Sequence, residues 1–156
     1  MTVSKANLDS LPEPTPAPDS RVVADTNTAA EETQPRRVIV NSGAMSEFIG
    51  AFDVPSKVTN FVYRCRFSHC WNGIATRHSD TMDCKFFVDG KAVVLGLAHP
   101  GFVKFRDERG RNLTDREASY IAAEYLRERL EQEDEHSLYD IAAADVTRII
   151  KRLDIR

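Results

Sequence analysis

The sequence has 156 residues, of which 42% are hydrophobic and 29% charged, and its formal net charge is −3. This composition is ordinary for a globular protein with one domain and a tail. No apolar run approaches the roughly 20 residues of a membrane-spanning helix, so we expect no membrane partner. The first residues lack the apolar core of a signal peptide, so we expect a cytoplasmic protein. The sequence has three cysteines, an odd and low number that argues against a disulfide scaffold.

The first 37 residues differ in composition from the rest of the chain. They hold five of the seven prolines, no glycine and no aromatic residue. Such a stretch buries too little apolar surface to offset the entropy lost on ordering it. We therefore predict a disordered, proline-rich acidic tail over 1–37 and a single small α+β domain over 38–156. A short helix over 43–52 is expected near the start of this domain.

Three segments rich in β-branched and aromatic residues follow. They predict strands over 58–71, 74–88 and 91–97, the second interrupted near residue 80. Asn72-Gly73 and Asp89-Gly90 separate these segments, and both dipeptides favour two-residue type I′ hairpin turns. The sequence therefore predicts a three-stranded antiparallel meander whose register is set by the two turns.

Alternation along the predicted strands assigns their side chains to two faces. The buried face collects the apolar, aromatic and histidine side chains: Phe61, Tyr63, Cys65, Phe67, His69, Trp71, Ile74, Thr76, His78, Met82, Cys84, Phe86, Val88, Val93, Leu95 and Leu97. The opposite face carries four cations and a phenylalanine, together with Cys70 and Asp83: Arg64, Arg66, Arg77, Lys85 and Phe87.

Helical periodicity follows the meander. Apolar spacing predicts helices over 114–132 and 141–153, and Thr114 with Glu117 forms a capping box at the start of the first. Pro100 and Gly110 are typical of the two ends of a helix over 100–109, for which a short strand over 102–105 is the alternative. We therefore predict an α+β fold in which two or three C-terminal helices pack on one face of the meander.

Cysteine and histidine side chains are the first candidates for a chemical site. The metal-ligating candidates are Cys65, His69, His78 and Cys84, but their spacing matches no standard zinc pattern and a flat sheet face would hold them apart. We therefore predict no metal and no cofactor. A Cys–His catalytic site near the first predicted hairpin is the third functional hypothesis, because no orienting group accompanies the pair.

Charge is unevenly distributed along the chain. Residues 56–112 carry a net +5 and lie between two segments of −4 each. We therefore predict a non-catalytic interaction or regulatory module that binds an acidic protein surface through Arg64, Arg66, Arg77, Lys85 and Phe87. Nucleic-acid binding by the same face is the alternative, because clustered cations neutralise phosphates and an exposed ring stacks on a base. Self-association through the last helix or through 38–40 is a further expectation.

Overall fold

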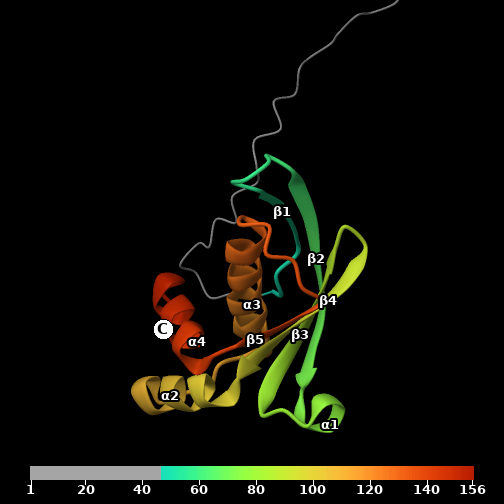
Figure 1. Cartoon of the computed structure of the whole chain (residues 1–156). Coiled ribbons are helices and arrows are strands. Elements are labelled where there is room, and N and C mark those ends of the chain that lie inside the picture. Colours follow the sequence, from blue (N-terminus) through green and yellow to red (C-terminus); the bar gives the residue numbers. More distant parts are fainter. Residues whose placement is uncertain (1–46) are drawn as a thin grey trace, which may run out of the picture. The chain divides into compact units, whose positions relative to one another are not determined.

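The computed structural model describes residues 47–156, which form an α+β domain with one five-stranded sheet (Figure 1). The strands lie side by side in chain order: β1 (Ala51–Pro55), β2 (Val62–Asn72), β3 (Thr81–Val88), β4 (Lys91–Ala98) and β5 (Leu138–Ile141). The helices of this part of the chain are α1 (Ile74–Arg77), α2 (His99–Arg109), α3 (Asp115–Leu130) and α4 (Ala143–Arg152). The predicted tail over 1–37 and the segment 38–40 lie outside the described residues.

The sheet has one more strand at each edge than the predicted meander. β1 pairs antiparallel with β2, and β5 pairs parallel with β4. β1 begins inside the helix predicted over 43–52, and its alternation, with Phe52 and Val54 buried, is that of a strand. β5 includes Ile141, where the sequence predicts the last helix to start, and α4 begins at Ala143 instead. Strands of four or five residues offer too few positions for their alternation to be recognised in a sequence.

The predicted turn at Asp89-Gly90 is confirmed. Every pair of partners on β3 and β4, from Thr81 and Ala98 down to Val88 and Lys91, has the predicted register. Both turn residues have left-handed backbone, with φ of 46° at Asp89 and 81° at Gly90, as a type I′ turn requires.

The predicted hairpin turn at Asn72-Gly73 is wrong. Gly73 has a φ of −71°, and Oδ1 of Asn72 accepts a hydrogen bond from the backbone N–H of Ile74 at 2.9 Å. This local hydrogen bond turns the chain into the one-turn helix α1 rather than straight back along β2. The helix ends at His78, whose φ of 52° is left-handed, and β3 starts only at Thr81.

A β-bulge in β2 changes which side chains face the core. The register shifts between Phe67 and His69, so Ser68 is the extra residue. Beyond the bulge Cys70 faces the core side, while His69 and Trp71 face away from it. The predicted faces of these three residues are therefore wrong, because side-chain alternation reverses at an inserted residue.

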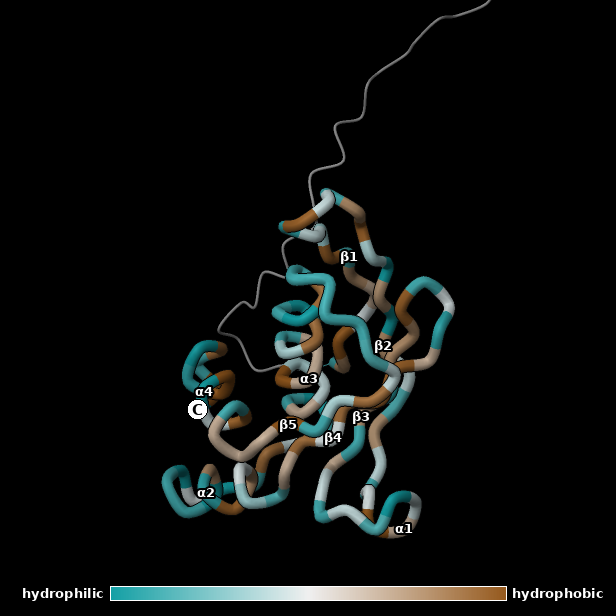
Figure 2. The backbone as a smooth tube through the Cα atoms, viewed as in Figure 1, coloured by the Kyte–Doolittle hydropathy of each residue, from teal (hydrophilic) through white to brown (hydrophobic). Residues whose placement is uncertain are grey.

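The hydrophobic core lies between the sheet and the helices on one of its faces (Figure 1). The predicted helices over 100–109 and 114–132 are confirmed as α2 and α3, with Gly110 as the C-cap of the first and Thr114 in the capping box of the second. Hydrophobic residues recur along β3, β4 and α3, whereas the loop after α3 is hydrophilic (Figure 2). Among residues 47–156 no helix is long and apolar enough to span a membrane. The cytoplasmic location stays a prediction.

Candidate binding face

The helices α3 and α4 pack on one face of the sheet and leave the other face open (Figure 1). We call this open side the outer face. Its residues come from all five strands: Ala51, Asp53, Pro55, Val62, Arg64, Arg66, His69, Trp71, Asp83, Lys85, Phe87, Ala92, Val94, Gly96, Leu138 and Asp140. Of the described helices, only the short α1 lies over it, at the end where β2 leaves the sheet. Within the described residues the outer face is therefore exposed along most of β2 and half-buried at Lys85 and Phe87 of β3.

Strand pairing brings cations and aromatic rings together in the middle of the outer face. Arg66 lies directly opposite Phe87, and beyond the bulge His69 lies opposite Lys85. Trp71 follows in the next row of the sheet, two residues after His69. Basic and aromatic side chains therefore share one continuous band along β2 and β3.

Three of the predicted binding cations lie on the outer face without an ion pair in the described part of the chain, although Asp53 on β1 lies directly opposite Arg64. Arg64, Arg66 and Lys85 form no ion pair with any carboxylate of residues 47–156. By contrast, most arginines elsewhere in this part of the chain contact a carboxylate: Arg77, Arg106, Arg111, Arg127, Arg129, Arg148, Arg152 and Arg156. Like charges that lie close together without a partner repel one another, and an anion bound among them would relieve that repulsion.

Phe87 lies between two of these cations. The guanidinium carbon of Arg66 and the ammonium nitrogen of Lys85 are each 5.1 Å from the centroid of the Phe87 ring. Attraction between a cation and the face of an aromatic ring holds both side chains beside the phenyl group. The ring itself is partly exposed. Cations and ring therefore form one cluster on the open side of the sheet.

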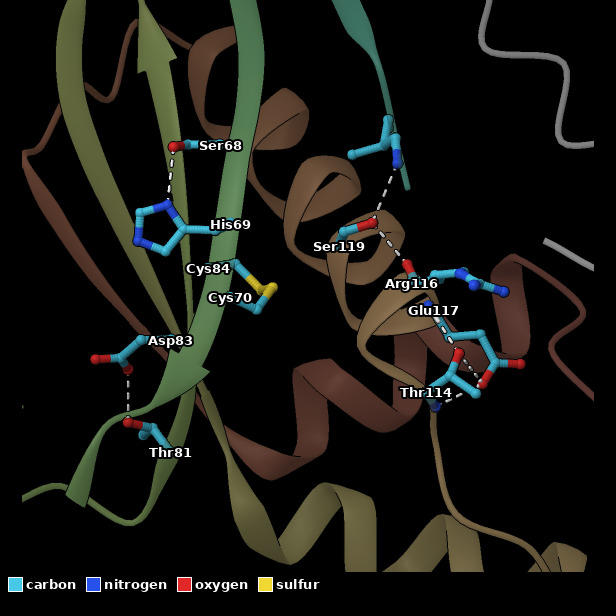
Figure 3. Close-up of a disulfide and its surroundings, with 11 residues drawn as sticks. Ser68, His69, Cys70, Thr81, Asp83, Cys84, Thr114, Arg116, Glu117 and Ser119 are labelled. Atoms are coloured by element: carbon cyan, nitrogen blue, oxygen red, sulfur yellow. Dashed lines mark hydrogen bonds between the residues drawn. A yellow bond between two sulfur atoms is a disulfide. The ribbon is translucent and has the colours of Figure 1, made fainter. Parts of the chain in front are cut away.

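His69 and Trp71 extend this cluster toward the far end of β2. Their ring centroids are 5.1 Å apart, and the indole N–H of Trp71 donates a hydrogen bond to Oγ1 of Thr76 at 2.8 Å. Oγ of Ser68 lies 2.9 Å from Nδ1 of His69 on the same side of the sheet (Figure 3). Sequence reasoning missed both rings because it placed them in the core, and a histidine in a supposedly buried row was the one signal against that placement.

Arg77 has a different position from the other predicted cations. It belongs to α1, and its guanidinium contacts the carboxylates of Asp83 at 2.8 Å and Asp140 at 3.1 Å. Hydrogen bonds to Asp83 raise the pKa of Arg77, so it remains a cation that is fully occupied within the fold. We therefore infer that Arg77 holds α1 against the sheet and is not one of the cations that bind a partner.

The cysteine and histidine candidates for a chemical site do not converge. Cys65 is a buried free thiol on the core side, and burial raises its pKa to about 12. His69 lies on the outer face, and His78 is exposed at the end of α1. A Cys–His pair between Cys65 and His69 is therefore separated by the sheet. Within the described residues, no three side chains of the types His, Cys, Asp and Glu come together as metal ligands.

A disulfide joins Cys70 to Cys84 on the core side of the sheet (Figure 3). The two residues are directly opposed on β2 and β3, and their Cα atoms are 4.2 Å apart. The sequence places Cys84 on the buried face, as observed, but assigns Cys70 to the opposite face and so misses the bond between them. The bulge at Ser68 is the reason, because it moves Cys70 to the face that Cys84 occupies. The bond ties the two central strands together behind His69 and Trp71.

A cavity of about 580 Å³ lies beside α2, away from the predicted Cys–His site. Its lining residues are Asp80, His99, Pro100, Val103, Lys104, Asp107 and Glu108. Nδ1 of His99 lies 3.0 Å from Oδ1 of Asp80, without the alignment of a hydrogen bond. No serine, threonine or cysteine is among the described residues that line this cavity, so it lacks the hydroxyl or thiol nucleophile of a Ser–His–Asp or Cys–His site.

Comparisons of the chain with protein-family models, with curated proteins and with solved structures find no match. What the outer face can do therefore follows from its side chains alone. It presents three cations that form no ion pair within residues 47–156, and three aromatic rings, on a surface that the described helices leave largely open. Such a surface suits the binding of anions and of planar rings.

Proposed function

We propose that this protein is a non-catalytic binding module whose outer face holds an anionic partner. Arg64, Arg66 and Lys85 supply the positive charge, and Phe87 supplies an apolar surface between them. The observation that carries the proposal is that none of these three cations forms an ion pair within residues 47–156, on a face that the described helices leave open.

The pattern of ion pairs supports a role in binding rather than in folding. A cation that stabilises the domain is expected beside a carboxylate, as Arg77 is beside Asp83. Arg64 and Arg66 lie on the same strand two residues apart, which separates their Cα atoms by about 6.6 Å. Their mutual repulsion costs a little stability in the free protein. An anionic partner would remove this repulsion and gain two or three charge-assisted hydrogen bonds.

The test is binding of the full chain to immobilised heparin, a polyanion without aromatic rings. We expect the protein to be retained at low salt despite its net charge of −3, and Arg64→Glu/Arg66→Glu to elute without retention. Its matched control is Arg109→Glu/Arg116→Glu, which changes the net charge equally at two exposed arginines outside the outer face. Circular dichroism establishes that both variants are folded.

Equal retention of the two double variants would contradict the proposal, because it would show that net charge rather than the outer face governs binding. Absence of retention in the unaltered protein at low salt would contradict it as well. Retention that is lost only when Arg64 and Arg66 are reversed supports it.

A further inference from the structure

The outer face contains more aromatic surface than the recognition of a simple anion requires. Phe87 lies between Arg66 and Lys85, and the rings of His69 and Trp71 lie 5.1 Å from each other in the neighbouring rows. We propose that the anionic partner is a single-stranded nucleic acid whose bases stack on Phe87 and Trp71 while its phosphates bind Arg64, Arg66 and Lys85. This inference rests on the proposed function and names the partner class for the same face.

The aromatic rings distinguish nucleic acid from an acidic protein segment. Carboxylates of a peptide would satisfy the cations but would leave Phe87 and Trp71 without a planar partner. A nucleobase has such a planar face, and stacking on an accessible ring is tolerant of sequence because every base has one. Arg66 and Lys85 both lie over the Phe87 ring, so a base that stacks on this ring takes the place of one of them, and the displaced cation can bind the phosphate of the same nucleotide.

The same rings distinguish a single strand from a duplex. In a double helix the faces of the bases are stacked on one another, so they are not accessible to protein side chains. A sheet surface with partly exposed rings therefore fits an unpaired strand, whose bases can be spread over it. The band of basic and aromatic side chains along β2 and β3 has the extended shape that such a strand needs.

Trp71 makes the proposal directly measurable. It is the one tryptophan of the sequence, so the intrinsic tryptophan fluorescence of the whole chain reports from the outer face. We expect titration with a thymidine oligonucleotide of about 12 nucleotides to quench this fluorescence to a saturating value, because a stacked base quenches an indole ring. The logarithm of the affinity should fall against the logarithm of salt concentration with a slope of about −2 for three neutralised phosphates.

Two conservative variants test where the bases stack. Phe87→Leu removes the ring between Arg66 and Lys85 and should weaken binding roughly 5- to 150-fold, the range for losing one stacked base. Phe61→Leu is the matched control, because Phe61 is 53% exposed but precedes β2 and lies outside the outer face. It should leave the affinity unchanged. Equal affinities of the two variants would overturn the stacking on Phe87.

Three further outcomes would overturn the partner class. The first is equal binding of a duplex of the same length, and the second is equal binding and equal quenching by polyglutamate, which would indicate an acidic protein segment. The third is oligonucleotide binding without any change in Trp71 fluorescence, which would place the strand elsewhere. Retention on heparin that depends on Arg64 and Arg66, combined with no oligonucleotide binding, would refute this inference while leaving the proposed function intact.

Discussion

Arg77 holds the buried carboxylate of Asp83 with two hydrogen bonds, from Nε to Oδ2 and from Nη2 to Oδ1, each 2.8 Å long. The Asp83 side chain is 0% exposed and that of Arg77 is 21% exposed. Oγ1 of Thr81 donates a third hydrogen bond to Asp83 at 2.7 Å. Asp140 contacts Arg77 from β5, so one guanidinium joins α1 to two strands that are far apart in the sequence. This network closes one end of the outer face.

Removing Asp83 should therefore destabilise the domain strongly. In Asp83→Ala the Arg77 guanidinium would lose its main partner while remaining largely covered, and we expect the free energy of unfolding to fall by about 2–4 kcal/mol. Urea denaturation measures this loss. Asp53→Ala is the control, since Asp53 lies on the same face without an ion pair, and its effect should stay within about 0.5 kcal/mol. Equal losses in the two variants would refute the role of the Arg77 pair.

The network also predicts that Gly96 cannot gain a side chain without a loss of stability. A Cβ atom at Gly96 would collide with Nη2 of Arg77 and would lie 3.1 Å from Oδ1 of Asp83. We expect Gly96→Ala to lower the free energy of unfolding by about 1–3 kcal/mol. At Gly50 nothing lies within 4 Å of an added Cβ, so Gly50→Ala is the matched control. If Gly96→Ala unfolds at the same urea concentration as this control, the guanidinium moves aside freely and the packing argument fails.

The elements that the sequence predicts correctly are those whose signals are local. Asp89-Gly90 needs left-handed backbone at two adjacent residues, and the Thr114 capping box is complete within four residues. The turn at Asn72-Gly73 has an equally strong local signal but fails, because the Asn72 side chain bonds to the N–H of Ile74 and starts a helical turn. The two edge strands are too short to show alternation, and only pairing with β2 and β4 defines them.

The candidate site was predictable only as far as the bulge at Ser68. The two arginines are assigned correctly because they precede the inserted residue in β2. Lys85 and Phe87 are assigned correctly because the turn between β3 and β4 is regular. Beyond Ser68 every assignment along β2 reverses. A bulge leaves no signature in the composition of a strand, because it depends on how the partner strand is paired.

The Cys70–Cys84 disulfide should stabilise the domain because it closes a loop in the unfolded chain. The two residues are 14 apart in the sequence, for which loss of chain entropy in the unfolded state predicts about 3 kcal/mol. We expect Cys70→Ser/Cys84→Ser to unfold at lower urea concentration by about this free energy. Dithiothreitol should lower the stability of the unaltered protein and leave that of the double variant unchanged.

Thiol titration in denaturant provides an independent check on the disulfide. One reactive thiol, that of Cys65, is expected before reduction and three thereafter, which accounts for every cysteine of the sequence. Three thiols in protein purified without reductant, or equal effects of dithiothreitol on the protein and the double variant, would show that the bond does not form. Since the disulfide lies behind His69 and Trp71, its reduction should also alter the tryptophan fluorescence.

The contacts of Glu128 predict a loss of stability in acid. Its carboxylate accepts hydrogen bonds from Arg148 at 2.8 and 2.7 Å, and these, with the nearby charges of Arg148 and Arg152, lower the pKa of Glu128 below 4.5. Because the folded-state pKa is the lower one, this stabilisation is complete above pH 4.5 and is lost as the pH falls through the folded-state pKa. Glu128→Gln should therefore lower the free energy of unfolding by about 0.5–1 kcal/mol at neutral pH, and the difference should vanish in acid.

In Glu108→Gln, whose carboxylate lies 4.0 Å from Lys104 and is exposed, the urea midpoint should not change at either pH. A difference between Glu128→Gln and the unaltered protein that persists undiminished in acid would show that the arginine pairs do not carry this stability.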